Sequence, residues 1–255
     1  MKIKKSLGQN FFVNENLGNY IINILANSNC TSVVEIGPGL GFFTEKLIKK
    51  FENVIVIEKD REIAQNLKFQ FPKILVINND FLDIDLNTIA SENTTFFGSL
   101  PFNVSKKIIK KVIESKYFTN PSFFIIQKEV AEKYTSSSPN NNYLATKTLL
   151  YAKTKKILDI SPDSFRPKPK VMSSLIGFYP LKKSYGIFIG NKSLEQFDIF
   201  LQSAFKQPRK KLLNNLKRYR FKEEQREKIM ELLERRAQHT SLEDFYLLFS
   251  NILSS

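Results

Sequence analysis

The chain has 255 residues, 42% of them hydrophobic, and its 39 lysine and arginine residues outnumber 25 acidic residues to give a net charge of +14. This composition excludes a globally disordered chain, and no apolar run is long enough to span a membrane. With Cys30 as its one cysteine the chain forms no internal disulfide, so a cytoplasmic location is expected. The positive charge favours a nucleic-acid partner, although a lysine-rich coding bias would leave the same trace.

The first 180 residues alternate short apolar runs with helical patterns. The expected strands are 33–36, 54–57, 74–77, 95–97, 123–126, 155–160 and 171–179. The expected helices are 16–26, 44–51, 61–71, 105–116 and 143–153. Strands that alternate with helices predict an α/β fold with a mostly parallel, doubly wound sheet.

Beyond residue 193 the pattern is helical only, with expected helices at 194–205, 209–219, 223–236 and 242–252. We therefore expect a Rossmann-like domain over residues 1–180, a linker over 181–192 and a small all-helical domain over 193–255. A basic run crosses the second of these helices, formed by Arg209, Lys210, Lys211, Arg218 and Arg220. It is expected to contact RNA phosphates, with a solvated face as the alternative.

Glycine and acidic residues follow three consecutive expected strands. Gly37, Gly39 and Gly41 form a strand-to-helix turn that lets the backbone approach a ligand closely. Glu58 follows Gly37 by 21 residues (58 − 37) and can accept hydrogen bonds from both hydroxyls of a ribose. Asp80 is placed to accept a hydrogen bond from an adenine amino group. Because the carboxyl ends of parallel strands share one crevice, a nucleotide-type cofactor is predicted, either NAD or S-adenosylmethionine.

The segment Ser99-Leu100-Pro101-Phe102 at the end of the fourth strand separates these cofactors. The exocyclic amine of adenine is a poor nucleophile, because its lone pair is delocalised into the ring. The Ser99 hydroxyl and a carbonyl near Pro101 can accept its two hydrogens, and Phe102 can stack on a flipped-out base. Attack on a sulfonium needs no metal ion. The segment thus favours amine methylation, although by itself it also suits a turn with a core phenylalanine.

Five motifs in chain order resemble the bacterial ribosomal RNA adenine dimethyltransferases of the small subunit, the kasugamycin-sensitivity dimethylases. They are 5–11, 35–41, 98–103, 127–131 and 165–171. The resemblance implies a Rossmann-like enzyme that uses S-adenosylmethionine to dimethylate two adjacent adenines in the 3′-terminal hairpin of 16S rRNA. It also implies a role in small-subunit biogenesis, an immature subunit as partner, no membrane association and a monomer when free.

The resemblance also implies roles for single residues. Asn10 and Phe12 would cover the cofactor, while Gly37, Glu58 and Asp80 would hold it. Ser99 would border the cofactor and, with Pro101 and Phe102, face the target base, and Phe165 would be a second stacking residue. No metal site is expected. Two positions depart from the family pattern, since Ser99 replaces an asparagine and Phe102 replaces a tyrosine.

Three other functions remain open. One is a large-subunit rRNA adenine methyltransferase of the antibiotic-resistance type, which shares the catalytic segments. Another is a non-catalytic RNA-binding assembly factor, which Ser99 in place of asparagine would allow. The third is a nicotinamide oxidoreductase, against which the segment 99–102 argues.

Overall fold

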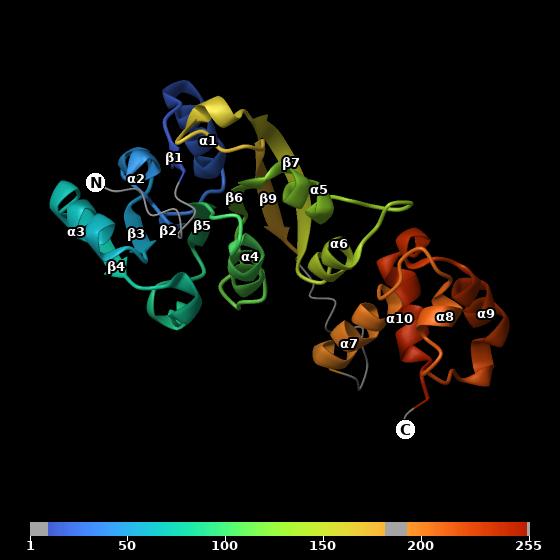
Figure 1. The fold of residues 1–255 in the computed structure, drawn as a ribbon. Helices are drawn as coiled ribbons and strands as arrows, with labels where there is room; N and C mark the ends of the chain where they lie inside the picture. The colour runs from blue at the N-terminus through green and yellow to red at the C-terminus, as the bar shows by residue number, and fades with distance from the viewer. Residues whose placement is uncertain (1–9, 182–192, 254–255) are drawn as a thin grey trace. The chain divides into compact units, whose positions relative to one another are not determined.

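The computed structural model describes residues 10–181 and 193–253 (Figure 1). The first residues of the family-like motif, 5–9, and nearly all of the expected linker lie outside this part of the chain. Contacts between Cα atoms divide the chain into two compact units. We call residues 1–131 with 154–180 the sheet unit, and residues 132–153 with 181–255 the helical unit. The sequence placed 132–153 in the first domain, whereas in the structure this segment belongs to the helical unit.

The sheet unit is built on seven strands in the order β4-β3-β2-β5-β6-β9-β7 (Figure 1). Their bounds are β2 (Ser32–Ile36), β3 (Asn53–Glu58), β4 (Leu75–Asn78), β5 (Thr94–Ser99), β6 (Ser122–Gln127), β7 (Ala152–Ile160) and β9 (Ser173–Pro180). All the expected strands are present. Neighbours from β4 to β6 run parallel, and β9 pairs antiparallel with β6. The expected doubly wound α/β fold is therefore confirmed.

The strand order reverses at β2. From β2 the chain proceeds to β3 and β4 on one side, and then returns to place β5 on the other side. The crevice outside the carboxyl ends of β2 and β5 is therefore the place where this class of sheet binds ligands. The helices that connect the strands include α1 (Glu15–Ala26), α2 (Phe42–Leu47), α3 (Arg61–Gln70), α4 (Ser105–Ile113) and α5 (Lys128–Tyr134).

The N-terminal arm is held by a two-stranded sheet that the sequence did not suggest. Strand β1 (Phe11–Phe12) pairs antiparallel with β8 (Phe165–Arg166), and Phe12 lies opposite Phe165. The ring centroid of Phe12 lies 5.2, 4.8 and 5.1 Å from those of Phe42, Phe43 and Phe165. This cluster continues into the main core of the unit. Residues from both ends of the unit thus meet beside the crevice.

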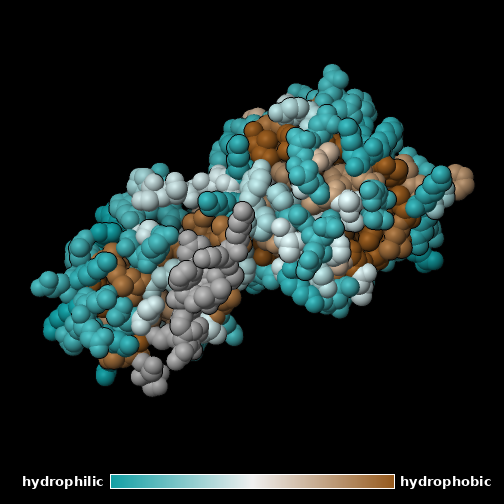
Figure 2. All heavy atoms as spheres, turned by 180° about the vertical axis from the view of Figure 1, so that it is seen from behind, coloured by the Kyte–Doolittle hydropathy of each residue, from teal (hydrophilic) through white to brown (hydrophobic). Residues whose placement is uncertain are grey.

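The helical unit contains α6 (Tyr143–Thr148), α7 (Leu194–Ala204), α8 (Leu212–Asn215), α9 (Arg226–Glu234) and α10 (Leu242–Ser250). Its own core includes Phe197, Phe200 and Phe245, each fully buried. Leu150 and Tyr151, from the segment 132–153, pack into this same core. Seen from behind, hydrophilic side chains cover most of the surface, with apolar ones between them (Figure 2).

One expected helix is wrong over most of its length. The sequence predicts a helix at 209–219, but only α8, of four residues, forms there. The backbone of Lys211 pairs instead with Arg236, which makes it extended. At the other end, the Asn215 side chain donates to the carbonyls of Ala204 and Gln207, at 2.7 and 3.0 Å, and the helix stops. The expected helix at 143–153 also ends early, because β7 begins at Ala152.

Candidate active site

A cavity of about 250 Å³ lies at the carboxyl ends of β2, β3, β4 and β5. This is where the reversal of strand order predicts a ligand. Eight residues that the sequence placed at the site line it: Asn10, Gly37, Glu58, Asp80, Ser99, Pro101, Phe102 and Phe165. The chain positions that carry them are up to 155 residues apart (165 − 10), and the fold brings them to one crevice.

The glycine turn leaves room for a ligand. Gly37 has a φ of +69°, and a Cβ built on it would meet no atom within 4 Å. Gly39 has a φ of +56°, and its Cβ would lie 2.9 Å from the ring of Phe11. A side chain at Gly37 would therefore be strained by the backbone conformation and would enter open space. The backbone there is free to approach a bound molecule.

Glu58 presents a buried carboxylate at the end of β3. Its side chain is 8% exposed, and Oε1 accepts the Asp60 N–H at 2.8 Å. Burial raises the pKa of Glu58, while hydrogen bonds from the backbone of Asp60 and Gly39 act in the opposite direction. A carboxylate fixed in this way can accept the two hydroxyls of a ribose, which fits the sugar of a nucleotide cofactor.

A second buried acid, Glu35, lies on β2 and has a different environment. It is 2% exposed, and the Thr44 hydroxyl donates to its Oε2 at 2.6 Å. The pKa of Glu35 is raised to about 8, mainly by burial and to a lesser extent by the charge of Glu58, while the hydrogen bond from Thr44 acts in the opposite direction. Glu35 does not line the cavity. Its role in the structure is to tie β2 to α2, directly behind the glycine turn.

Asp80 is held on both carboxylate oxygens. Lys59 Nζ lies 2.7 Å from Oδ2, and Oδ1 accepts the Leu82 N–H at 2.9 Å. The hydrogen bond from Lys59 holds the pKa of Asp80 below its usual value. Lys59 itself lines the cavity beside Glu58 and Asp80. The sequence analysis did not single out Lys59, although its place directly after Glu58 was a signal that it would lie at this edge.

Lys111 of α4 stabilises the turn that follows Asp80. Its ammonium donates to the carbonyls of Phe81, Leu82 and Ile84 at 2.9, 2.7 and 2.6 Å. Desolvation lowers the pKa of Lys111. Because α4 begins just after the segment 99–104, this contact connects the Asp80 side of the cavity with the Ser99 side. Sequence reasoning missed Lys111, because a lysine in a helix ordinarily faces solvent.

The segment 99–104 forms the opposite wall. Ser99 is partly buried at the end of β5, and the Leu100 N–H donates to Ile125 of β6 at 2.9 Å. The Pro101 carbonyl accepts the N–H groups of Val104 and Ser105, at 3.2 and 3.1 Å. In the part of the chain that the structure describes, the Leu100 carbonyl has no such partner. Leu100 O is thus the carbonyl near Pro101 that remains able to accept a hydrogen from a ligand.

Phe12, which the sequence analysis expected to cover the cofactor, does not line this cavity. Phe12 is 5% exposed in the aromatic core, whereas its neighbour Phe11 lines the cavity. Successive side chains of a strand point to opposite faces, and the pairing of β1 with β8 turns Phe12 inward. Phe165 does line the cavity, but it is 3% exposed and meets Phe12 edge to face at 5.1 Å. Phe102, which is partly exposed, offers the more accessible ring.

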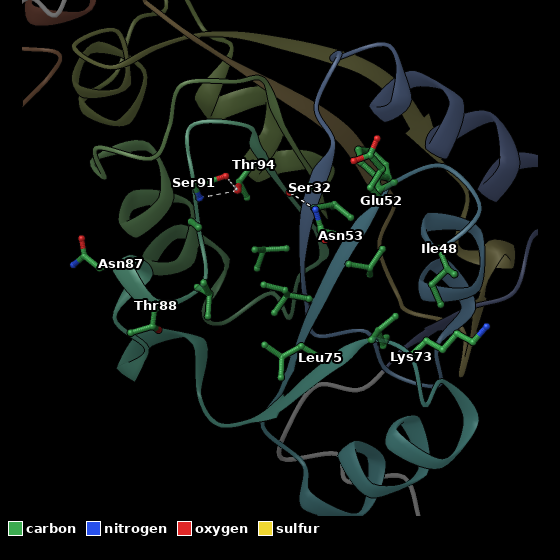
Figure 3. Close-up of a pocket in the computed structure, with 18 residues that line it drawn as sticks. Ser32, Ile48, Glu52, Asn53, Lys73, Leu75, Asn87, Thr88, Ser91 and Thr94 are labelled. Carbon is green, nitrogen blue, oxygen red and sulfur yellow. Dashed lines mark hydrogen bonds between the residues drawn. The ribbon is translucent and has the colours of Figure 1, made fainter.

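A larger hollow, of about 690 Å³, lies at the opposite edge of the sheet, where β2 to β5 begin (Figure 3). Its polar groups pair with one another: Asn53 donates to Ser32 at 3.4 Å, and Ser91 N–H donates to Thr94 at 2.9 Å. None of the residues expected at the site lines this hollow. Although this hollow is larger, the smaller cavity is the candidate active site, because Glu58 and the glycine turn line it.

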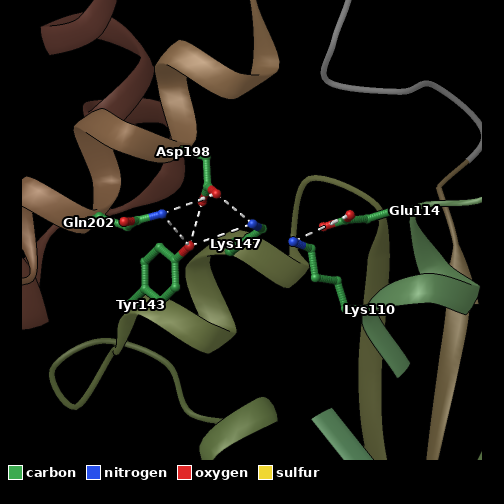
Figure 4. Close-up of polar contacts among 6 residues, drawn as sticks. All are labelled: Lys110, Glu114, Tyr143, Lys147, Asp198 and Gln202. Atoms are coloured by element: carbon green, nitrogen blue, oxygen red, sulfur yellow. Dashed lines mark hydrogen bonds and ion pairs between the residues drawn. The ribbon is translucent and has the colours of Figure 1, made fainter. Parts of the chain in front are cut away.

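The helical unit has its own polar cluster around Asp198 (Figure 4). Tyr143 donates to Asp198 Oδ1, and Lys147 lies 2.6 Å from Oδ2. The ion pair is only 15% and 22% exposed. Gln202 donates to the same carboxylate at 3.3 Å. The cluster joins α6 to α7, so it fixes the segment 132–153 within the helical unit.

The comparisons with known proteins agree on one family. The model of the family described as "Ribosomal RNA adenine dimethylase" matches residues 1–253. Among curated relatives, the "Ribosomal RNA small subunit methyltransferase A" of Pelagibacter ubique is 37% identical, over 85% of this chain and 84% of the relative. The protein of the same name in Chlorobium phaeobacteroides is 31% identical, over 98% of this chain and 91% of its own length.

Two solved structures share the fold. A dimethyladenosine transferase from Plasmodium falciparum superposes with a TM-score of 0.78 at 22% identity, covering 93% of this chain and 95% of its own. The 23S rRNA methyltransferase ErmE gives a TM-score of 0.76 at 21% identity, covering 94% and 98%. The two scores are close, so the fold does not distinguish a small-subunit from a large-subunit enzyme.

Proposed function

This chain belongs to the ribosomal RNA adenine dimethylase family, and we propose that it dimethylates the N6 amines of two adjacent adenines in the 3′-terminal hairpin of 16S rRNA. The methyl donor is S-adenosylmethionine, which supplies an activated methyl group on a sulfonium centre. The proposed partner is an immature small ribosomal subunit, which the protein meets in the cytoplasm as a monomer. The observation that carries this proposal is the cavity in which Glu58, Asp80 and Ser99 converge.

The cavity fits this cofactor by the chemistry of its donors and acceptors. We propose that Glu58 accepts the ribose hydroxyls and that Asp80 accepts the adenine amino group. Gly37 leaves open space at the turn, and Asn10 covers the site from the N-terminal arm. Both acidic residues are held by backbone N–H groups, so they need little rearrangement when the cofactor binds.

The target adenine is proposed to enter from the side of segment 99–102. Ser99 Oγ and the Leu100 carbonyl accept the two amine hydrogens, which draws the nitrogen toward tetrahedral geometry and exposes its lone pair. Phe102 stacks on the base, with Phe165 behind it. Since the donor carries a positive charge that is lost on transfer, the chain needs no strong base at this point.

The helical unit is proposed to bind RNA through its basic residues. Arg209 and Lys210 have no acidic partner in the part of the chain that the structure describes, whereas Lys211 pairs with Glu234. We therefore assign phosphate contacts first to Arg209 and Lys210. Binding of this kind depends strongly on salt concentration.

The decisive experiment is transfer of tritiated methyl groups to immature small subunits, with the modified bases mapped. Incorporation of up to four methyl groups into two adjacent adenines of the 3′-terminal hairpin of 16S rRNA is the expected result. Methylation of large-subunit RNA instead would identify the antibiotic-resistance type. No incorporation into either subunit, with the cofactor still bound, would identify a non-catalytic assembly factor.

A further inference from the structure

A third hollow lies within the helical unit, between α8, α9 and the segment that joins them. It encloses about 450 Å³. Leu216, Ile229 and Leu233 form its buried floor, each 3% exposed or less. At its mouth, Leu213 and Met230 remain 41% and 45% exposed, although both are apolar. Apolar surface that stays open in a hollow is suited to a ligand with flat, apolar faces.

The rim of this hollow is positively charged. Lys217, Lys222 and Arg226 line it together with one acid, Glu223. Glu223 pairs with Arg226 at 3.0 Å, while neither lysine has an acidic partner among residues 10–181 and 193–253. The surrounding stretch 206–222 contains eight lysines and arginines and no acidic residue: Lys206, Arg209, Lys210, Lys211, Lys217, Arg218, Arg220 and Lys222. Such a stretch favours a polyanion.

Backbone hydrogen bonds fix the segment around the hollow. Lys222 N–H donates to the Asn251 carbonyl at 2.8 Å, and Phe221 pairs with Ile252. Leu253 N–H donates to the Arg220 carbonyl at 2.8 Å, which completes this short connection to the C-terminal segment. The lysines on the rim are therefore carried by a formed loop, so a ligand would not have to order it.

We propose that this hollow binds one unstacked nucleotide of single-stranded ribosomal RNA. The base lies against Leu213 and Met230, and the adjoining phosphates contact Lys217 and Lys222. A paired RNA helix keeps its bases stacked, so it can offer phosphates but no base to the apolar mouth. An acidic peptide could also form ion pairs with the two lysines. RNA is favoured because the proposed function requires RNA binding, and the choice of partner rests on that function.

The test uses the full chain and a fluorescein-labelled single-stranded RNA of about ten nucleotides, with the matching duplex as a second probe. Two double variants probe the hollow: Leu213→Asn with Met230→Asn removes apolar surface without adding charge, and Lys217→Ala with Lys222→Ala removes the rim charges. The control is Lys153→Ala with Lys228→Ala, which removes two exposed lysines of the same unit outside both the hollow and the stretch 206–222. Fluorescence anisotropy is measured over a range of salt concentrations.

The apolar variant is expected to lose about tenfold in affinity for the single strand, and little for the duplex, because only the single strand offers an unstacked base. The rim variant is expected to reduce the slope of log affinity against log salt by about 1.4, for two lost contacts on a single strand at about 0.7 each. An unchanged far-ultraviolet circular dichroism spectrum and a Tm within a few degrees of the parent confirm that the helical unit remains folded in both variants.

The proposal is overturned if the apolar variant binds the single strand as tightly as the parent does. It is also overturned if the variant loses as much affinity for the duplex as for the single strand. A third contradicting result is a rim variant whose affinity for the single strand and salt slope fall no more than those of the control variant. These outcomes are independent of the proposed function. A parent protein that transfers no methyl group, while the variants still lose RNA affinity as described, would contradict the function and leave this site in place.

Discussion

Lys59 Nζ lies 2.7 Å from Asp80 Oδ2 at the edge of the candidate cofactor site. The lysine is exposed, whereas the other oxygen of Asp80 is fixed by the Leu82 N–H. Exposed ion pairs contribute little, because water competes for both charges. The hydrogen bond of Asp80 to a bound adenine should therefore matter more than its pair with Lys59.

Replacing Asp80 should weaken cofactor binding far more than replacing its partner. Asp80→Ala is expected to lower S-adenosylmethionine affinity roughly five- to hundredfold, the cost of leaving one hydrogen bond to a charged group unmade. Lys59→Met, which keeps a long apolar stem, should cause a distinctly smaller loss. Isothermal calorimetry measures both. Equal losses in the two variants would show that the ion pair, rather than Asp80 alone, forms the binding element.

Glu58 should make cofactor binding depend on pH. Its charged form accepts the ribose hydroxyls, and burial raises its pKa above the ordinary 4.5. Affinity should therefore fall as the pH drops through this raised pKa, at a higher pH than for an exposed glutamate. Glu58→Gln should weaken binding at neutral pH by roughly 1–3 kcal/mol and abolish this pH dependence. A pH profile identical to that of the parent would remove Glu58 from the site.

Ser99 should contribute to methyl transfer more than to cofactor affinity. Ser99→Ala is expected to lower kcat by roughly 10–1000-fold, as for loss of one positioned polar group at a reacting centre. Ser99→Asn, whose amide oxygen can also accept a hydrogen from the amine, should retain or raise the rate of the first transfer. Single-turnover methylation of immature subunits measures both rates. If Ser99→Ala turned over at the parental rate, the Ser99 hydroxyl would have no catalytic role. The Leu100 carbonyl and stacking on Phe102 would then have to account for catalysis.

The basic run should act through only part of its residues. Arg209→Ala with Lys210→Ala should flatten the salt dependence of RNA affinity by about one slope unit for each lost phosphate contact. Lys211→Ala should change it less, because Lys211 already pairs with Glu234. Binding assays over a salt series make the comparison, with cofactor affinity as the control. A larger effect from Lys211 would mean that its ion pair opens on RNA.

Glu35 should make the fold less stable in mildly alkaline solution. Its folded pKa of about 8 exceeds the unfolded value of 4.5, so the folded state holds a proton that the unfolded state has lost. Its contribution to stability is thus complete below about pH 4.5 and declines as the pH rises to about 8. Glu35→Gln keeps an acceptor for Thr44 and should flatten the fall of Tm over this window. If Tm fell with pH as steeply in Glu35→Gln as in the parent, a group other than Glu35 would be responsible for the pH dependence.

The site was predictable from the sequence where chemistry and strand ends coincide. Gly37, Glu58, Asp80 and Ser99 each follow an apolar run, and parallel pairing brings the ends of such runs to one edge whatever the loops between them do. The same reasoning had no access to side-chain direction in the arm. Phe11 and Phe12 are chemically identical, and only the pairing with β8 decides which of them faces the cavity.

Residues whose partners lie far away in the chain escaped prediction. Lys111 occupies an ordinary helix position, and its three carbonyl partners come from a turn about thirty residues earlier. The expected helix at 209–219 had suitable spacing, but the pairing of Lys211 with Arg236 prevails over local propensity. Both cases are long-range contacts, which no local pattern records.

The segment 132–153 also determines when parts of the protein can fold during synthesis. Asn141 donates through its backbone to Gln238 at 3.2 Å and through its side chain to Thr240 at 3.3 Å, contacts that span about one hundred residues. All seven strands of the sheet have left the ribosome once β9 emerges, whereas this segment still lacks the helices that bury it. A nascent chain paused at this point is expected to expose the side chains of Tyr143, Leu150 and Tyr151. The time needed to synthesise the C-terminal helices then sets how long these side chains remain accessible to proteases.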